Sequence, residues 1–186
     1  YIMVLTKTPI CNFEEKAHDF NLKGVDNKFY KLKNCVGSNG TIIMFICNHC
    51  PYVKAIIKDL VKDINELKNN GIETVAIMSN DTKNYPEDSF VNMLSFSKIN
   101  GFNFPYLFDE KQEVAKKFGA VCTPDFFGYN KNLSLQYRGR FRELRELIPV
   151  KNGESELKSA MMMIAKTQNG PKEQIPSMGC NIKWIK

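Results

Sequence analysis

The residues of this sequence with the clearest capacity for chemistry are Cys47 and Cys50, in the stretch Cys47-Asn48-His49-Cys50. The thiolate is the form of cysteine that attacks disulfides, and two cysteines at this spacing can close a disulfide with each other. We expect Cys47 to be the exposed nucleophile and Cys50 to attack the mixed disulfide that Cys47 forms with a substrate. The motif therefore predicts thiol–disulfide exchange.

The neighbours Asn48, His49 and Pro51 are the candidates that tune this pair. A charged His49 would stabilise a thiolate, which makes the reduced pair more stable and the disulfide a better oxidant. Pro51 lacks an N–H and suits an early helical position, where that donor has no intrahelical partner. The alternative for His49 is a solvent-exposed imidazole with no tuning role.

The elements around the motif favour this chemistry. Residues 41–46 form an unbroken apolar run, which predicts a strand buried on both faces. Apolar residues then recur at three- and four-residue steps, which predicts an amphipathic helix. They are Val53, Ile56, Ile57, Leu60, Val61, Ile64 and Leu67. The cysteines thus stand at a helix N-terminus, where a cysteine pKa can fall from ~8.5 to roughly 3.5–7.5.

Two other interpretations of the motif stay open. The cysteines could be small buried residues, or they could be half of a zinc or copper site. Structural zinc usually requires a second Cys or His pair at similar spacing. The remaining cysteines are isolated in the sequence, and the chain has only two histidines. These residues are Cys11, Cys35, Cys122 and Cys180, with His18 and His49.

Composition predicts one ordinary globular domain spanning residues 1–186, with 43% hydrophobic and 25% charged residues. Within it we expect an N-terminal extension with a hairpin (1–40) and a C-terminal tail (167–186). The apolar runs are far shorter than the ~18 residues of a membrane helix. Six cysteines without framework spacing favour an intracellular redox protein, so we expect a cytoplasmic location. The alternative is export, if a leader was removed before Tyr1; Met3 is a possible natural start.

The formal charge of +6 mildly favours anionic partners. All the arginines lie in one window, at Arg138, Arg140, Arg142 and Arg145. Their planar groups could hold a substrate carboxylate or phosphate, or they could be surface charges paired with Glu143 and Glu146. Nucleic-acid binding has no further support, because the sequence contains no aromatic-studded basic strip or reading motif.

Along the rest of the chain, the sequence predicts alternating strands and helices after an irregular segment at 1–18. We expect a hairpin over 20–32, strands over 72–78 and 104–108, helices over 86–101, 109–118 and 154–166, and a second hairpin over 126–137. The strand–helix–strand order implies parallel neighbours, whose carboxyl ends form the usual ligand-binding edge. Cys47 already lies at that edge.

This order of elements, with the cysteine motif and Thr123-Pro124, resembles the thioredoxin fold. More narrowly, it is similar to the peroxiredoxin-like redoxin branch with a CxxC motif, related to the alkyl hydroperoxide reductase/thiol-specific antioxidant superfamily. The matching stretches are 19–22, 44–54, 79–81 with 85–88, 104–107, 122–127, 137–140 and 177–180. The resemblance implies an α/β fold, with a central mixed sheet flanked by helices.

The resemblance also implies roles for individual residues. Cys47 would be the nucleophile, Cys50 the resolving thiol, and Pro124 a cis-proline facing the cysteines. Thr123 would offer backbone hydrogen bonds to an extended substrate. Two departures from the relatives are visible: the Pro-x-x-x-Thr/Ser-x-x-Cys pattern of peroxidatic sites is absent, and the strand before the motif lacks the buried aspartate of thioredoxins.

The leading prediction is a thiol–disulfide oxidoreductase that acts on protein or small-molecule disulfides without a cofactor or metal. Its electron partner would be a thiol system of the thioredoxin or glutathione type, with no nucleic acid or membrane involved. The alternatives are a thiol-dependent hydroperoxide reductase and a copper- or zinc-binding thiol protein. Cys122 and Cys180 are possible additional redox thiols, whereas we treat Cys11 and Cys35 as bystanders.

Overall fold

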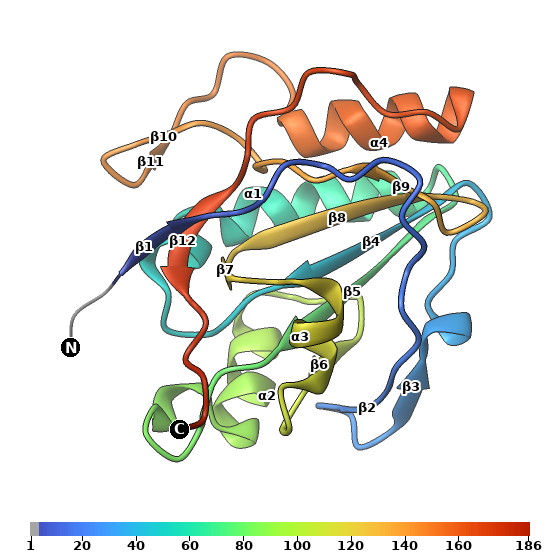
Figure 1. The fold of residues 1–186 in the computed structure, drawn as a ribbon. Helices are drawn as coiled ribbons and strands as arrows, with labels where there is room; N and C mark the ends of the chain where they lie inside the picture. Colours follow the sequence, from blue (N-terminus) through green and yellow to red (C-terminus); the bar gives the residue numbers. More distant parts are fainter. Residues whose placement is uncertain (1–3) are drawn as a thin grey trace.

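The computed structural model describes residues 4–186 and is built around a mixed sheet with helices on both faces (Figure 1). The sheet consists of β2 (Asn21–Gly24), β3 (Phe29–Lys31), β4 (Gly40–Phe45), β5 (Ile72–Met78), β6 (Tyr106–Phe108), β8 (Asp125–Asn130) and β9 (Leu135–Tyr137). Their spatial order is β3-β2-β6-β5-β4-β8-β9. The α/β architecture predicted from the sequence is confirmed.

Four α-helices and two short 3₁₀ turns connect the strands in the described part of the chain. The helices are α1 (Pro51–Lys68), α2 (Phe90–Ile99), α3 (Glu113–Phe118) and α4 (Glu156–Thr167), and the turns cover Leu32–Asn34 and Pro86–Asp88. The helix predicted over 86–101 begins at Phe90 instead. Ser89 caps its N-terminus by accepting a hydrogen bond from the backbone N–H of Asn92. No helix within residues 4–186 is long and apolar enough to cross a membrane.

The sheet separates two apolar cores because side chains alternate along each strand. On β4, Ile42 and Met44 face the core that contains α1 and α4, whereas Ile43 and Phe45 face the core that contains α3. The predicted apolar stripe of the helix after the motif is confirmed, since all seven of its residues are buried. β4 and β5 pair in parallel, so α1 makes the predicted crossover between neighbouring strands.

A second, smaller sheet joins the two ends of the described chain. It consists of β1 (Leu5–Lys7), β12 (Met178–Asn181) and β7 (Cys122–Thr123), with β12 in the middle and antiparallel to both neighbours. Figure 1 shows β12 lying beside β1. The prediction of an irregular segment over 1–18 was wrong for β1, because a three-residue strand leaves too short a pattern to recognise. Tyr1 and Met3 lie outside the described residues.

The arginine window is largely structural. Arg138 is buried and pairs with the buried Asp125 at 3.0 Å, and its guanidinium also lies over the Phe127 ring. Arg140 pairs with Glu156 at 2.7 Å. The interpretation of this window as surface charge paired with Glu143 and Glu146 was therefore wrong for Arg138. A short hairpin, β10 (Leu144–Arg145) and β11 (Ile148–Pro149), follows the window.

Candidate functional site

Cys47 and Cys50 lie at the carboxyl end of β4, where the chain turns into α1. Cys50 is the N-cap residue of α1 and Pro51 is its first residue, so the helix N-terminus acts on Cys50 more than on Cys47. Both cysteines are buried, with Cys47 1% and Cys50 0% exposed. The expectation that Cys47 is an exposed nucleophile was wrong, because the turn before the helix folds inward beneath neighbouring loops.

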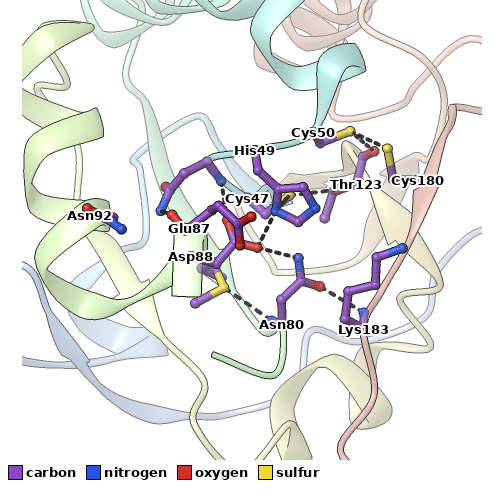
Figure 2. A network of polar contacts seen from close by, with 12 residues as sticks. Cys47, His49, Cys50, Asn80, Glu87, Asp88, Asn92, Thr123, Cys180 and Lys183 are labelled. Carbon is purple, nitrogen blue, oxygen red and sulfur yellow. Dashed lines mark hydrogen bonds and ion pairs between the residues drawn. The ribbon is translucent and has the colours of Figure 1, made fainter. Parts of the chain in front are cut away.

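The segment containing Thr123 contacts both thiols (Figure 2). The Thr123 hydroxyl lies 3.4 Å from Cys47 Sγ. The Thr123 carbonyl accepts a hydrogen bond from the Cys50 thiol at 3.2 Å. The peptide bond between Thr123 and Pro124 is cis. Two segments more than 70 residues apart in the sequence therefore meet at the sulfur atoms, as the redoxin resemblance implies for Thr123 and Pro124.

A buried carboxylate organises the other side of the motif. Asp88 is 0% exposed and accepts hydrogen bonds from the Asn48 backbone N–H at 2.8 Å, from the Asn80 side chain at 2.8 Å and from His49 Nδ1 at 2.6 Å. Asn80 also accepts a hydrogen bond from the backbone N–H of Lys183, which ties the C-terminal tail to this network. Figure 2 shows Asp88 at the centre of these contacts.

The sequence reasoning assigned no role to Asp88 or Asn80. The available signal was their position: both follow the carboxyl end of the second parallel strand, the edge at which Cys47 lies. Their pairing with the motif is long-range and could not be read from spacing alone. The buried hydroxyl of Tyr106, which donates to the Asn48 side chain at 2.9 Å, was missed for the same reason.

His49 is tuned by Asp88 and in turn faces Cys47. The hydrogen bond with Asp88 raises the pKa of His49 above its usual value of 6.5, although partial burial opposes the shift. Its Nδ1 atom lies 3.9 Å from Cys47 Sγ, close enough for a charged imidazole to stabilise a thiolate there. The side chain is 22% exposed and stacks on Tyr85, so His49 is the part of the motif nearest to solvent.

The two thiols of the motif differ in acidity, with Cys50 the more acidic. Burial raises the pKa of Cys47 well above that of a free cysteine, and the nearby Cys50 and Asp88 add to this. The pKa of Cys50 is lowered by its hydrogen bonds with the thiols of Cys180 and Cys47, assisted by the backbone N–H of Val53. Cys50, at the helix N-terminus, is therefore the more acidic of the two thiols, and while it is protonated it donates to the Thr123 carbonyl.

The remaining cysteines separate into one that joins the site and three that do not. Cys180 Sγ lies 2.9 Å from Cys50 Sγ, whereas the Cys122 thiol instead faces the Pro124 carbonyl at 3.9 Å. Burial raises the pKa of Cys11 and of Cys35 to about 11, so both are poor nucleophiles near neutral pH.

A groove lined by Tyr52 and Pro124, which closely follow Cys50 and Thr123 in the sequence, offers a place for a substrate, although no cysteine among residues 4–186 lines it. It has a volume of about 370 Å³ and is lined by residues from α1, from the cis-proline segment and from the arginine window. These residues include Tyr52, Pro124, Arg140, Arg142, Leu147 and Met178. Its lining combines apolar side chains with Arg140, Arg142 and Glu146, which suits an extended segment that carries polar groups.

Within residues 4–186, one group of side chains has the composition of a metal site. The ligand atoms of Cys47, His49 and Asp88 all lie within 4.8 Å of one another. A soft sulfur, an imidazole and a carboxylate could together bind zinc or copper. However, Asp88 already engages His49 Nδ1 at 2.6 Å, so a metal ion would have to replace that hydrogen bond.

Comparison with known proteins agrees with this geometry. The AhpC/TSA family model matches residues 13–142, which include the cysteine motif, Asp88 and the cis-proline segment. No curated protein sequence matches the chain. An uncharacterized conserved protein from Geobacillus kaustophilus is 38% identical, with 100% of this chain and 98% of that chain covered and a TM-score of 0.93.

Two further solved structures share the fold of this chain. A hypothetical protein from Sinorhizobium meliloti is 34% identical, with coverage of 97% of this chain and 98% of that chain and a TM-score of 0.89. The thioredoxin domain of a thiol-disulfide oxidoreductase from Bacteroides vulgatus has a TM-score of 0.58 at 11% identity, over 72% of this chain and 89% of that domain. The last comparison shows that the thioredoxin-like fold is shared.

Proposed function

Since the chain belongs to the AhpC/TSA family, we propose that it is a thiol–disulfide oxidoreductase whose redox couple is Cys47 and Cys50. The observation that carries the proposal is the contact of Thr123 with both sulfur atoms: its hydroxyl lies 3.4 Å from Cys47 and its carbonyl 3.2 Å from Cys50. This contact places the two thiols side by side against a segment that can present a substrate backbone. The buried Asp88 fixes the turn between them through Asn48 and His49.

Cys47 makes the first attack because the partly exposed His49 is its neighbour, whereas Cys50 is covered by Thr123 and Cys180. Cys50 first loses its proton to solvent because it is the more acidic thiol, and the proton of Cys47 then moves to the Cys50 thiolate, which is its hydrogen-bond partner. The new Cys47 thiolate attacks one sulfur of a substrate disulfide and forms a mixed disulfide, and the other substrate sulfur leaves as a thiolate. A charged His49 stabilises the attacking thiolate.

The second step releases the product. The departing thiolate takes the proton from Cys50, and the Cys50 thiolate attacks the Cys47 sulfur of the mixed disulfide. A Cys47–Cys50 disulfide forms, and the second substrate sulfur leaves as a thiolate. Two electrons have then moved from the protein to the substrate, and a thiol donor must reduce the couple for another turnover.

A disulfide-reduction assay with matched variants tests this proposal. We expect the protein to accelerate reduction of insulin disulfides by dithiothreitol, and we expect Cys47→Ser and Cys50→Ser to bring the rate down to the uncatalysed one. Cys11→Ser is the control, because Cys11 lies outside the site and should retain the wild-type rate. Full turnover in Cys47→Ser would contradict the assignment.

The midpoint potential of the couple shows the direction of electron flow. Equilibration in glutathione buffers, read by alkylation of each cysteine, gives this potential directly. A value near about −270 mV would indicate a reductant, and one near about −120 to −180 mV an oxidant or isomerase. The helix N-terminus stabilises the Cys50 thiolate, which favours the reduced form and hence the more oxidising value.

Hydroperoxide reduction is the second candidate function. Cys47 is only 1% exposed, and a small oxidant can reach such a buried thiol more easily than a protein substrate can. The Cys47 thiolate would take one oxygen from the peroxide and become a sulfenic acid, and Cys50 would then displace water to form the disulfide. Consumption of hydrogen peroxide with dithiothreitol as donor measures this activity. A rate no higher than that of Cys47→Ser would remove it.

A further inference from the structure

Cys180 belongs to the redox site as a third thiol: we propose that it exchanges into the Cys47–Cys50 disulfide and stores the oxidised state as a Cys50–Cys180 disulfide. The step rests on the proposed function and needs no external reagent. The Cys180 thiol attacks the Cys50 sulfur, the Cys47–Cys50 bond breaks, and the Cys180 proton passes to Cys47. Cys47 returns to the thiol form while the protein as a whole stays oxidised.

The first observation behind this proposal is the distance between the two sulfur atoms. Cys180 Sγ lies 2.9 Å from Cys50 Sγ, well inside the ~3.5–4.0 Å at which apolar atoms pack. A disulfide bond is about 2.05 Å long, so the sulfur atoms need to approach by only ~0.9 Å. Cys50 and Cys180 share a hydrogen bond between their thiols, so the contact is polar and not simple packing.

The second observation is how the backbone places Cys180. Its strand β12 pairs with β7 so that Cys180 lies opposite Thr123, and cross-strand partners project to the same face of a sheet. Thr123 contacts both thiols of the motif, so Cys180 shares the face that points to them. Cys122 lies opposite Asn181 in the same ladder and therefore projects to the other face. The register thus selects Cys180 as the third thiol.

The third observation is that β12 is held firmly at this distance. A Cβ atom on Gly179 would lie 1.9 Å from the Thr123 carbonyl oxygen, so only glycine lets the two backbones approach this closely. The Ser177 hydroxyl donates to the Pro124 carbonyl at 2.7 Å, and β1 pairs along the other edge of β12. A lone buried cysteine used as packing would not require such positioning.

Disulfide mapping in variants that each lack one cysteine tests this proposal separately from the proposed function. Wild type, Cys47→Ser, Cys180→Ser and Cys122→Ser are equilibrated with oxidised and reduced glutathione, alkylated, digested and analysed by mass spectrometry. We expect Cys47→Ser to form a Cys50–Cys180 disulfide, and Cys180→Ser to form only Cys47–Cys50. Cys122→Ser is the matched buried control and should show the wild-type pattern.

The outcomes distinguish the two ideas. Free Cys50 and Cys180 thiols in Cys47→Ser across all buffers would overturn the third-thiol proposal, while a Cys47–Cys50 disulfide in Cys180→Ser would leave the proposed function standing. If Cys47→Ser forms a Cys50–Cys180 disulfide but Cys180→Ser forms no Cys47–Cys50 disulfide, the third-thiol role of Cys180 is supported and the proposed Cys47–Cys50 couple is overturned. If Cys47→Ser fails to fold by circular dichroism, Cys47→Ala replaces it.

The order of events in wild type gives a second readout. After one equivalent of oxidised glutathione is added to reduced protein, rapid quenching should trap Cys47–Cys50 first and Cys50–Cys180 later. The two species should together account for one disulfide per chain. Appearance of Cys50–Cys180 with no earlier Cys47–Cys50 would overturn the exchange step.

Discussion

At the scale of single residues, Asp88 has the widest influence on the site. A fully buried carboxylate is costly unless its oxygens are satisfied, and here three donors surround it: a backbone N–H, an amide and an imidazole. Two of these donors, on Asn48 and His49, belong to the turn between the cysteines. The shape of that turn and the protonation of His49 are therefore controlled by one distant side chain.

Replacing this carboxylate should change the titration of His49. In Asp88→Asn the charged hydrogen-bond partner is gone, so we expect the pKa of His49 to fall from its raised value to near or below about 6.5. NMR titration of the imidazole signals measures this, and His18 provides an internal reference because the chain contains only two histidines. A His49 pKa equal to that of wild type would contradict the coupling.

The same contact makes folding stability depend on pH. The folded pKa of His49 is raised above the unfolded value, so the protonated form is favoured by folding. The stabilisation is complete below about pH 6.5 and is lost as the pH rises through the folded pKa. We expect the stability difference between wild type and His49→Gln to shrink over that range in urea denaturation. A stability difference that stays constant with pH would show that the His49–Asp88 contact does not contribute to the pH dependence of folding.

At the scale of elements, the strand β12 connects the C-terminal tail to the cysteines. It pairs with β7 next to the cis-proline and with β1 near the chain start, so three segments distant in sequence meet at one edge of the site. The tail predicted over 167–186 ends in an apolar stretch, and such an end favours packing against the body. Ile182 is buried as that idea requires, although Trp184 and Ile185 are exposed.

We expect Gly179→Ala to loosen this strand. Its new methyl group would clash with the Thr123 backbone, so β12 must move away, at a cost of about 1–3 kcal/mol in the free energy of unfolding. The movement should also raise the rate at which iodoacetamide modifies Cys50 in the native protein. Met178→Ala is the control, because Met178 lies next to Gly179 but is 39% exposed. Equal stability and labelling in both variants would show that the close approach has no such role.

The helices and strands could be predicted from the sequence better than the long-range contacts between them. The strand before the motif and the buried stripe of α1 follow from local periodicity, which a single chain segment displays in full. The Cys50–Cys180 contact joins residues 130 apart in the sequence, and β1 pairs with β12 at a still larger separation, from Leu5 to Cys180. The Asp88 network is also long-range, and no local pattern encodes such a register. The burial of Cys47 was missed for the same reason.

At the scale of the whole molecule, the ion pair of Asp125 and Arg138 joins the sheet to the loops around it. Burial raises the pKa of Asp125 to about 6 even though Arg138 works against the shift. Asp125 shares its sheet face with Phe127, whose ring lies under the guanidinium of Arg138, whereas Phe126 faces the core that contains the cysteines. This aspartate is therefore structural and lies on the opposite face of the sheet from the thiols of Cys47 and Cys50.

Removing one partner of this pair should be costly. Arg138→Gln leaves a buried carboxylate without its cation, so we expect a loss of about 3–5 kcal/mol in the free energy of unfolding, measured by urea denaturation. Adding Asp125→Asn to the same chain should restore part of that loss, because the uncompensated charge disappears. A change below about 1 kcal/mol in the single variant would mean that the pair is effectively neutral.

The burial of both motif cysteines has a consequence for kinetics. A disulfide substrate is too bulky to reach the sulfur atom of a residue that is 1% exposed, so each encounter must wait for a local opening of the surrounding segments. When reclosing is faster than the reaction, the observed rate is the product of the opening equilibrium and the intrinsic rate. Turnover then has a ceiling set by the fraction of molecules that are open, and substrates that stabilise the open form would raise it.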